Sequence, residues 1–315
     1  MLRKHKGILF TALIPVMALL LSSCSGTARA VEPARDDASP GAVRSSDPVV
    51  YTPEAPGEEV IGDDPLVIDI SNAAQGYVMA RYSGDAAKAN IQLTGPDGIT
   101  YKYFLPPSDG YIPLPLTGGN GAYEIDGYEN VEDDMYAALF KESADFTLDS
   151  DLLPYLYPNQ YVNFSADTRA VALAAQTVSG VGSDLDAVEE IYHYVVDNIS
   201  YDEEKAATVA AGYLPVVDDT LSSGKGICFD YAALTAAMLR SQDIPTRLEI
   251  GYSGDIYHCW ISVYIEDVGW IDKLIEFDGR DWTRLDPTFA SSNNSSTAVL
   301  EYIGDGANYT VQYMH

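Results

Sequence analysis

Cys228 is the residue of this chain best suited to covalent chemistry, because of the residues on either side of it. Gly224 and Gly226 precede it and allow a tight turn, and apolar residues at helical spacing follow it. The residues on one face of this helix are Tyr231, Leu234, Thr235, Met238 and Leu239. A thiol at the helix N-terminus lies at the positive end of the dipole, which favours the thiolate and lowers the pKa of Cys228. The pattern therefore predicts a nucleophile, whereas a structural cysteine would be expected within the apolar face.

His258 could supply the base that such a cysteine needs. Thr246–Tyr252 and Ile256–Ile265 are predicted to be neighbouring strands. Side chains alternate between the two faces of a strand, so His258 and Cys259 point to opposite sides. We expect His258 to face Cys228 while Cys259 packs behind the sheet, an arrangement that argues against a disulfide between the two cysteines.

An aspartate near a third strand could orient the histidine. Asp286 follows the strand-like Trp282–Leu285 and precedes Pro287. A carboxylate beside the histidine strand can accept the imidazole N–H, which fixes the tautomer and stabilises the imidazolium. Taken alone, Asp-Pro is an ordinary turn signal. The prediction for Asp286 therefore depends on the order of the cysteine, the histidine and the aspartate along the chain.

The order of these motifs resembles the transglutaminase-like superfamily. The shared features are a glycine-preceded cysteine on a helix followed by Asp-Tyr-Ala, a histidine with tryptophan two residues on, and Asp-Pro-Thr. The segments between them, Leu239–Ser241, Ile244–Arg247 and Gly251-Tyr252, match in the same order. The resemblance extends over Asp184–Tyr302, which is more than a third of the chain.

The resemblance implies a papain-like α+β fold, in which a helix bearing the nucleophile packs on an antiparallel sheet bearing the histidine and the aspartate. Carried over position by position, it makes Cys228 the nucleophile, His258 the base and Asp286 the orienting acid. Trp260 and Tyr231 become candidates for substrate contact, although a tryptophan here could equally belong to the core. One departure is a cysteine between the histidine and the tryptophan, where the family commonly has alanine.

The residues before this region indicate a small all-β domain. Between residues 65 and 148, strand-like runs alternate with turn signals such as Gly95–Gly98. This spacing is typical of a β-sandwich of about seven strands. The runs are Leu66–Ile70, Gly76–Tyr82, Ala89–Thr94, Ile99–Leu105, Ala122–Tyr128 and Met135–Phe140. Four of their tyrosines could line a binding face or could simply be good strand formers, namely Tyr77, Tyr101, Tyr103 and Tyr123.

From residue 149 the pattern changes to helices followed by strands. Ser183 and Asp184 can cap a helix that ends near Asn198, with apolar residues at helical spacing. His193 lies on this helix, where a histidine is expected to be structural. The predicted fold class is therefore α+β, with a papain-like transglutaminase core over residues 149–315 after a β-sandwich over residues 65–148.

The N-terminus predicts export and a lipid anchor. Met1–Lys6 is basic, and Gly7–Leu21 is apolar but shorter than the run of about twenty residues that a spanning helix needs. Leu21–Cys24 resembles the lipobox of bacterial lipoproteins, in which the cysteine carries the lipid. We expect a signal peptide over residues 1–23, a flexible tether over residues 24–64, and attachment through Cys24 to the outer face of the cell membrane. Secretion with an incidental cysteine is the alternative.

Charge and histidine content limit the partners that this chain can have. The chain has 47 acidic and 18 basic side chains and a net charge of −29, which makes nucleic acid a poor partner. Its four histidines show no metal-ligand spacing, and no EF-hand-like loop is visible. Neither a metal nor another cofactor is expected, and the oligomeric state is left open.

These features predict a thiol-dependent acyl-transfer enzyme of the bacterial cell surface, acting on protein or peptidoglycan peptides. Cys228 would form a thioester with the substrate carbonyl, which water resolves by hydrolysis and an amine resolves by crosslinking. The activity is accordingly that of a cysteine protease or amidase, or that of a transglutaminase-type crosslinker. The alternative is a non-catalytic surface module that keeps the fold and uses the β domain for recognition.

Overall fold

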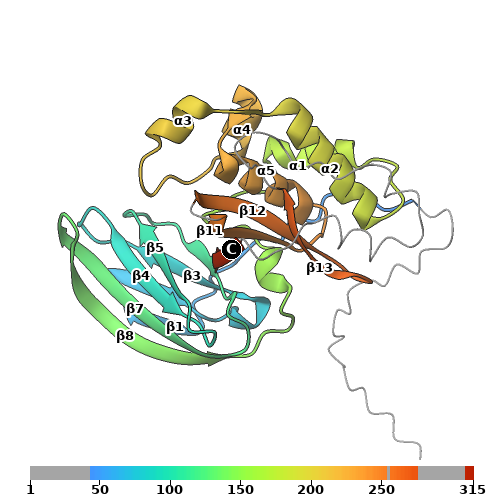
Figure 1. The fold of residues 1–315 in the computed structure, drawn as a ribbon. Coiled ribbons are helices and arrows are strands. Elements are labelled where there is room, and N and C mark those ends of the chain that lie inside the picture. Colours follow the sequence, from blue (N-terminus) through green and yellow to red (C-terminus); the bar gives the residue numbers. More distant parts are fainter. Residues whose placement is uncertain (1–42, 254–255, 276–308) are drawn as a thin grey trace, which may run out of the picture. The chain divides into compact units, whose positions relative to one another are not determined.

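Two four-stranded antiparallel sheets form the N-terminal part of the structure, which is a computed structural model that describes residues 43–253, 256–275 and 309–315 (Figure 1). Their strand orders are β1-β2-β3-β6 and β5-β4-β7-β8. The strands are β1 (Val60–Asp63), β2 (Leu66–Asp69), β3 (Tyr77–Tyr82), β4 (Ala89–Thr94), β5 (Thr100–Leu105), β6 (Ile112–Pro115), β7 (Gly121–Glu132) and β8 (Met135–Phe146). Ile68 and Val78 of one sheet and Ile91 and Ile125 of the other belong to the same core. The two sheets therefore pack face to face as a sandwich.

The six strand-like runs of the sequence all coincide with observed strands, whereas β1 and β6 were not predicted. Both are edge strands of the first sheet. Pro113 and Pro115 lie in β6, and proline is tolerated at a sheet edge because it has no N–H to donate. Gly62 of β1 has φ 72°, a conformation that interrupts a strand-like pattern.

The four tyrosines considered in the sequence are all buried in the hydrophobic core. Tyr77, Tyr103 and Tyr123 are buried among apolar side chains, as expected of good strand formers. Tyr101 is also buried but differs from the others, because its hydroxyl accepts the backbone N–H of Met314 at 3.3 Å.

The C-terminal part combines five helices with an antiparallel sheet in the described residues. The helices are α1 (Arg169–Thr177), α2 (Asp184–Asn198), α3 (Glu203–Thr208), α4 (Val217–Ser223) and α5 (Cys228–Arg240). The sheet has the order β13-β12-β11-β14. Its strands are β11 (Thr246–Ser253), β12 (Ile256–Ile265), β13 (Gly269–Ile275) and β14 (Tyr309–Met314). The short strands β9 (Ser200–Tyr201) and β10 (Lys225–Gly226) pair in parallel. The described chain also has two short 3-10 helices, η1 (Ala73–Gln75) between β2 and β3 and η2 (Leu153–Tyr155) after β8.

The two predicted helices have the predicted positions. In α2 the Ser183 hydroxyl accepts the N–H of Asp186 at 3.2 Å, which is the expected cap. Almost every residue of α5 after its first turn is buried, as a helix that is apolar on all sides must be. α5 packs against β11 and β12 on one side and against α1, α2 and α4 on the other, and Figure 1 shows the helices gathered on one face of this sheet. The predicted α+β class is thus confirmed.

Arg240, at the end of α5, is a fully buried cation that joins three segments. Its guanidinium donates to the carbonyl oxygens of Thr246 at 2.7 and 3.0 Å, of Tyr157 at 2.7 Å and of His315 at 2.7 Å. Burial lowers the pKa of Arg240 to about 9, which still leaves it charged at neutral pH. These bonds join three segments to the end of α5, namely the start of β11, the segment after η2 and the residue after β14.

Several predictions concern residues outside the described ranges. These are the signal peptide over residues 1–23, lipidation at Cys24, the strand Trp282–Leu285, and Asp286. By their contacts the described residues group into one compact unit, and the domain boundaries at residues 65 and 149 stay predictions. Within the described ranges, no helix combines the length and apolar character needed to cross a membrane.

Candidate active site

Cys228 is the first residue of α5, as its surroundings in the sequence predicted. Gly224 ends α4 with φ 61°, a left-handed conformation that favours glycine. At Gly226 a Cβ would lie 2.6 Å from the Cβ of Asp230, so a larger residue would collide with the first turn of α5. Gly226 also pairs with Tyr201 in the β9–β10 ladder. The two glycines therefore let the chain turn from α4 into α5 within four residues.

The environment of the Cys228 thiol differs from the one expected. Burial raises the pKa of Cys228, and the nearby carboxylate of Asp230 raises it further. The backbone N–H groups of Cys259 and Phe229 act in the opposite direction without reversing the shift. The expectation that the helix N-terminus lowers the pKa of Cys228 is therefore wrong in direction, because desolvation of the thiolate outweighs the N–H donors.

His258 lies on β12, where it pairs with Gly251 of β11. Its ring is buried, and this burial lowers the pKa of His258. Within the described ranges its Nε2 atom is buried without a hydrogen-bond partner. The imidazole is consequently neutral at neutral pH, with one ring nitrogen that still requires a partner.

The two faces of β12 are arranged differently from the prediction. Cys259, Ile261 and Val263 belong to the same core as α5, so Cys259 lies on the helix side of the sheet rather than behind it. His258 projects from the opposite face, and no hydrogen bond between its ring and the Cys228 thiol occurs among the described contacts. Both thiols are free, and burial raises the pKa of Cys259 well above its usual value. Cys259 is therefore an inert thiol.

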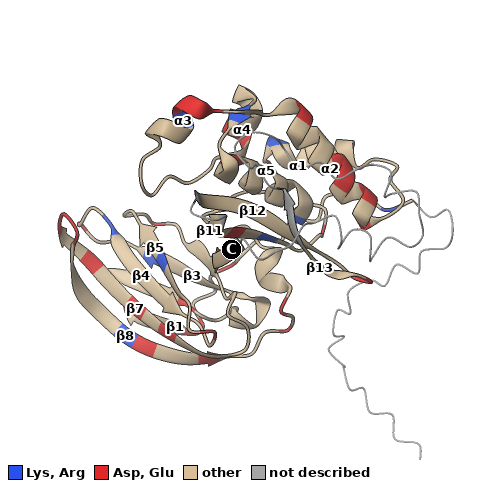
Figure 2. Ribbon diagram, in the orientation of Figure 1, with Lys and Arg blue, Asp and Glu red and all other residues tan. Residues whose placement is uncertain are grey.

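A cavity of about 730 Å³ brings Cys228, His258 and Cys259 to one place. Six tyrosines contribute to its described lining, namely Tyr101, Tyr161, Tyr201, Tyr213, Tyr257 and Tyr313. Lys102 is the one side chain of fixed charge in that lining, which contains no Asp or Glu. The site is thus an aromatic, nearly uncharged cavity in a strongly acidic chain. Figure 2 marks the Asp and Glu residues of the described elements in red.

A second histidine, which the sequence gave no reason to consider, also lines the cavity. The ring of His315 stacks on Tyr161 with a centroid distance of 3.8 Å. Burial, with a smaller effect from Arg240, lowers the pKa of His315 to about 3. A base this weak is poorly matched to a thiol at neutral pH, which leaves His258 as the better candidate.

The two residues predicted to contact substrate lie in the core instead. Trp260 is fully buried and its indole N–H donates to Glu249. Tyr231 is also buried, and its hydroxyl donates to the carbonyl oxygen of Ile199 at 2.6 Å. Neither borders the cavity along its described lining. Asp286 lies outside the described residues, and no cluster of three metal-ligating side chains occurs inside them.

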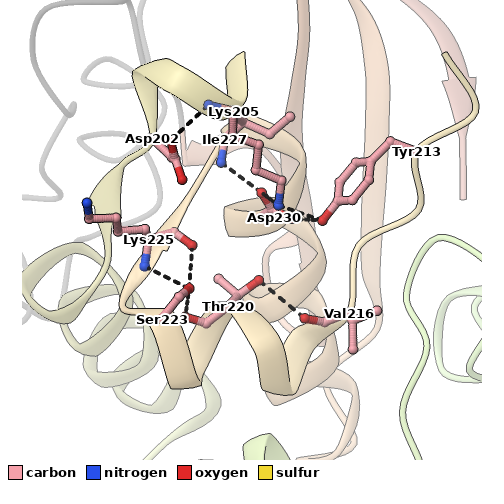
Figure 3. A network of polar contacts seen from close by, with 9 residues as sticks. All are labelled: Asp202, Lys205, Tyr213, Val216, Thr220, Ser223, Lys225, Ile227 and Asp230. Carbon is pink, nitrogen blue, oxygen red and sulfur yellow. Dashed lines mark hydrogen bonds and ion pairs between the residues drawn. The ribbon is translucent and has the colours of Figure 1, made fainter. Parts of the chain in front are cut away.

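Asp230 and its two partners are the polar residues of the site that sequence reasoning missed. Asp230 accepts the N–H of Ile227 at 2.8 Å, the ammonium of Lys205 at 2.7 Å and the hydroxyl of Tyr213 at 2.5 Å (Figure 3). An acidic residue three positions after a helix N-cap is a capping signal that could have identified Asp230. Lys205 and Tyr213 carry no such signal, because they meet Asp230 only in the folded chain.

The raised pKa of Cys228 predicts how the labelling rate of its thiol depends on pH. Iodoacetamide should label Cys228 slowly at neutral pH and faster as the pH rises past the ordinary thiol pKa of about 8.5, because burial raises the pKa of Cys228. Peptide mapping of the alkylated protein across this range measures the rate. A fast rate that stays constant from about pH 6 to 8 would mean that an imidazolium holds the sulfur as a thiolate, against this expectation.

The structure has a fold that is typical of one class of cysteine enzymes. In this fold a helix with a cysteine at its N-terminus packs on an antiparallel sheet that carries a histidine. Residues 171–273 match the model of the transglutaminase-like superfamily. This region of the chain is transglutaminase-like, and the resemblance inferred from its motifs is confirmed for it.

Individual proteins resemble this chain more distantly. The UPF0252 protein MJ1282 of Methanocaldococcus jannaschii is 29% identical over 92 residues. This match covers 25% of the present chain and 26% of that protein, so the chain spans about a quarter of its relative.

Two crystal structures are also similar. A protein of Cytophaga hutchinsonii proposed to be a cysteine protease is 16% identical, with a TM-score of 0.34 over 62% of this chain and 73% of that one. A proposed protease from Parabacteroides distasonis is also 16% identical, with a TM-score of 0.30 over 57% of this chain and 36% of that one. Similarity at this level says nothing of the substrate of the present chain.

Proposed function

We propose that this protein is a thiol-dependent acyl-transfer enzyme in which Cys228 is the nucleophile and His258 the base. The observation that carries the proposal is that Cys228 begins the buried helix α5 and borders one cavity together with His258. A cysteine and a histidine from separate elements that converge on an aromatic cavity form a typical enzyme site. The match of residues 171–273 to the transglutaminase-like superfamily supports this function, because cysteine-dependent enzymes are typical of that superfamily.

The reaction begins from a neutral thiol and a neutral imidazole, since burial raises the pKa of Cys228 and lowers that of His258. As the Cys228 sulfur bonds to the carbonyl carbon of an amide, the thiol proton passes to His258 across the cavity that both residues border. The C–N bond then breaks, and His258 returns this proton to the leaving amine. Water or a second amine then attacks the thioester, and its proton passes by way of His258 to the Cys228 sulfur as the thiol is released. The N–H groups in the first turn of α5, which have no partner within the helix, are suited to stabilise the oxyanion.

Asp286 is proposed as the third member of this group, orienting the ring of His258. The buried Nε2 of His258 has no hydrogen-bond partner among the described residues. A buried ring nitrogen of this kind is normally satisfied. A carboxylate there would fix the tautomer that leaves the other nitrogen free to accept the thiol proton, and the place of Asp286 in the ordered motifs makes it the candidate.

The N-terminal sequence supports a place of action at the cell surface. The basic start, the apolar run and Leu21–Cys24 support export and lipidation at Cys24. An enzyme held by a tether on the outer face of a bacterial membrane would meet protein and peptidoglycan peptides. We therefore propose amides of these polymers as its substrates, with hydrolysis or crosslinking as the outcome.

Intact-mass measurement tests the proposal. The purified protein is incubated with a glutamine-containing peptide or with peptidoglycan fragments, with and without a primary amine. A covalent adduct on Cys228, together with peptide products that have lost ammonia, gained water or become crosslinked, is expected. If none of these substrates gives an adduct or a product, the function is not acyl transfer to these amides.

The alternative function is a binding module on the same fold that has no catalytic activity. The observation that favours it is the direction of two pKa shifts. The raised pKa of Cys228 and the lowered pKa of His258 both oppose an ion pair between the two side chains. Such a module would bind peptides in the cavity without forming an adduct. Binding of the same peptides, measured by calorimetry in the absence of any mass change, would identify this case.

A further inference from the structure

One wall of the cavity is a segment with almost no packing of its own. Residues 203–213 comprise α3 and the loop that follows it, and we call them the cavity wall. Ala206 and the run from Val209 to Tyr213 line the cavity. No residue of α3 is buried, and across the whole cavity wall only Lys205 and Tyr213 are partly buried. Apolar burial therefore contributes little to fixing the wall in place.

Two polar side chains attach this cavity wall to the nucleophile helix. The Lys205 ammonium lies 2.7 Å from one carboxylate oxygen of Asp230, and the Tyr213 hydroxyl donates to the other oxygen at 2.5 Å (Figure 3). Lys205 also donates to the Tyr213 hydroxyl at 2.7 Å and lies 4.3 Å from the centre of its ring. Burial opposes the charge of Lys205, but the bonds to Asp230 and Tyr213 prevail and raise the pKa of Lys205.

Asp230 connects this attachment to the reactive cysteine. It lies two residues after Cys228 and is fully buried. The oxygen that binds Lys205 also accepts the N–H of Ile227, the residue before Cys228. One carboxylate thus fixes both the first turn of α5 and the cavity wall. Each of its described hydrogen bonds goes to one of these two segments.

The chemistry of the cavity indicates what the wall is placed to receive. The residues of the wall that line the cavity before Tyr213 are alanine, valine and glycine. Tyr161, Tyr257 and Tyr313 are among the aromatic side chains of the remaining lining. A cationic ligand would find no carboxylate in the described lining and would meet the ammonium of Lys102. A flat, uncharged group gains apolar contact with both the tyrosines and the wall.

We propose that Asp230 is a positioning residue, which through Lys205 and Tyr213 holds residues 203–213 as the wall of a pocket for an uncharged aromatic or apolar group next to the reacting carbonyl. This assignment of substrate class rests on the proposed function of Cys228. The position of the wall relative to Cys228 determines how well such a group binds, whereas Asp230 itself does not touch the substrate.

Alkylation of Cys228 by paired reagents tests the pocket without requiring turnover. Iodoacetamide reports on the thiol alone, and N-benzyl iodoacetamide adds an uncharged ring. The labelling rate with the benzyl reagent should saturate with concentration. In Lys205→Met the ratio of the benzyl rate to the iodoacetamide rate should fall by about tenfold, the effect of losing a hydrogen bond to a charged group. Lys205→Arg, which keeps the cation, should restore most of the ratio.

Tyr213→Phe provides a second variant, which removes the hydroxyl that donates to Asp230 and accepts from Lys205 but leaves the ion pair between Lys205 and Asp230 intact. It should lower the same ratio by a smaller factor. The matched controls are Lys141→Met and Tyr128→Phe, from a similar cluster in which Tyr128 donates to Asp126 at 2.9 Å and Lys141 donates to Tyr128 at 2.8 Å. These controls lie on β7 and β8, outside the described lining, and should leave the ratio as in the wild type.

The possible results separate the pocket from the function. An unchanged ratio in Lys205→Met and Tyr213→Phe, or an equal fall in the controls, overturns the role of Asp230. Faster labelling by a reagent with a trimethylammonium group than by the benzyl reagent overturns the uncharged ligand class. The expected ratios combined with no adduct from any peptide would support the pocket while refuting acyl transfer, so the two proposals fail in different assays.

Discussion

Replacing Cys228 by alanine should abolish the covalent adduct between this protein and any acyl donor. No other described thiol can take its place, because Cys259 is buried and its pKa is raised well above the usual value. The change removes the sulfur and leaves the helix start intact, since Ile227 and Asp230 make the bonds of the first turn. Intact mass after incubation with a glutamine-containing peptide measures the effect, and no adduct should be detectable.

Cys259→Ala is the matched control for this variant. Both cysteines border the same cavity, and both are free. Because Cys259 packs in the core against α5, its replacement should lower the stability slightly and leave the adduct in place. An adduct that persists in Cys228→Ala and disappears in Cys259→Ala would assign the chemistry to Cys259 and refute the proposed mechanism.

The elements that place Cys228 and His258 were predictable because their signals are local. Glycines before Cys228 and apolar residues at helical spacing after it predict the start of α5, and the structure begins this helix at the same residue. The strand predicted over Ile256–Ile265 is β12 with the same bounds. Each signal lies within about a dozen residues of sequence, the range over which hydrophobic periodicity is informative.

The strands that escaped prediction depend on distant partners. β14 pairs with β11 across more than fifty residues of sequence, and β6 is an edge strand that contains two prolines. β6 lacks a strong strand pattern of its own, and β14, although rich in Tyr, Thr and Val, is stabilised by a neighbour that its sequence does not indicate.

The errors at the site also arise from contacts between residues that are distant in the sequence. Alternation along β12 correctly separates His258 from Cys259, but which face meets α5 is decided by packing. The pKa of Cys228 depends on how deeply the thiol is buried, which a helix start does not specify. Lys205 and Tyr213 reach Asp230 only through the path of the chain, so the cavity wall could not be foreseen from these residues.

Replacing His258 by glutamine should slow adduct formation by about 10²–10⁴-fold, the usual contribution of a general base. Glutamine approximates the size of the imidazole and can still form hydrogen bonds, but it cannot take the thiol proton. The wild-type rate should fall as the pH drops below the ordinary histidine pKa of about 6.5, and burial moves this fall to lower pH because it lowers the pKa of His258. In His258→Gln the acid limb should disappear.

His193→Gln is the matched control, because it makes the same replacement at a histidine outside the described lining of the cavity. His193 lies on α2, where its Nε2 is 3.7 Å from Glu189. This variant should keep both the rate and the acid limb. If His258→Gln instead retains the wild-type rate and pH profile, the thiol must lose its proton to another group. His315 would then be the first to replace, since it is the other histidine in the described lining.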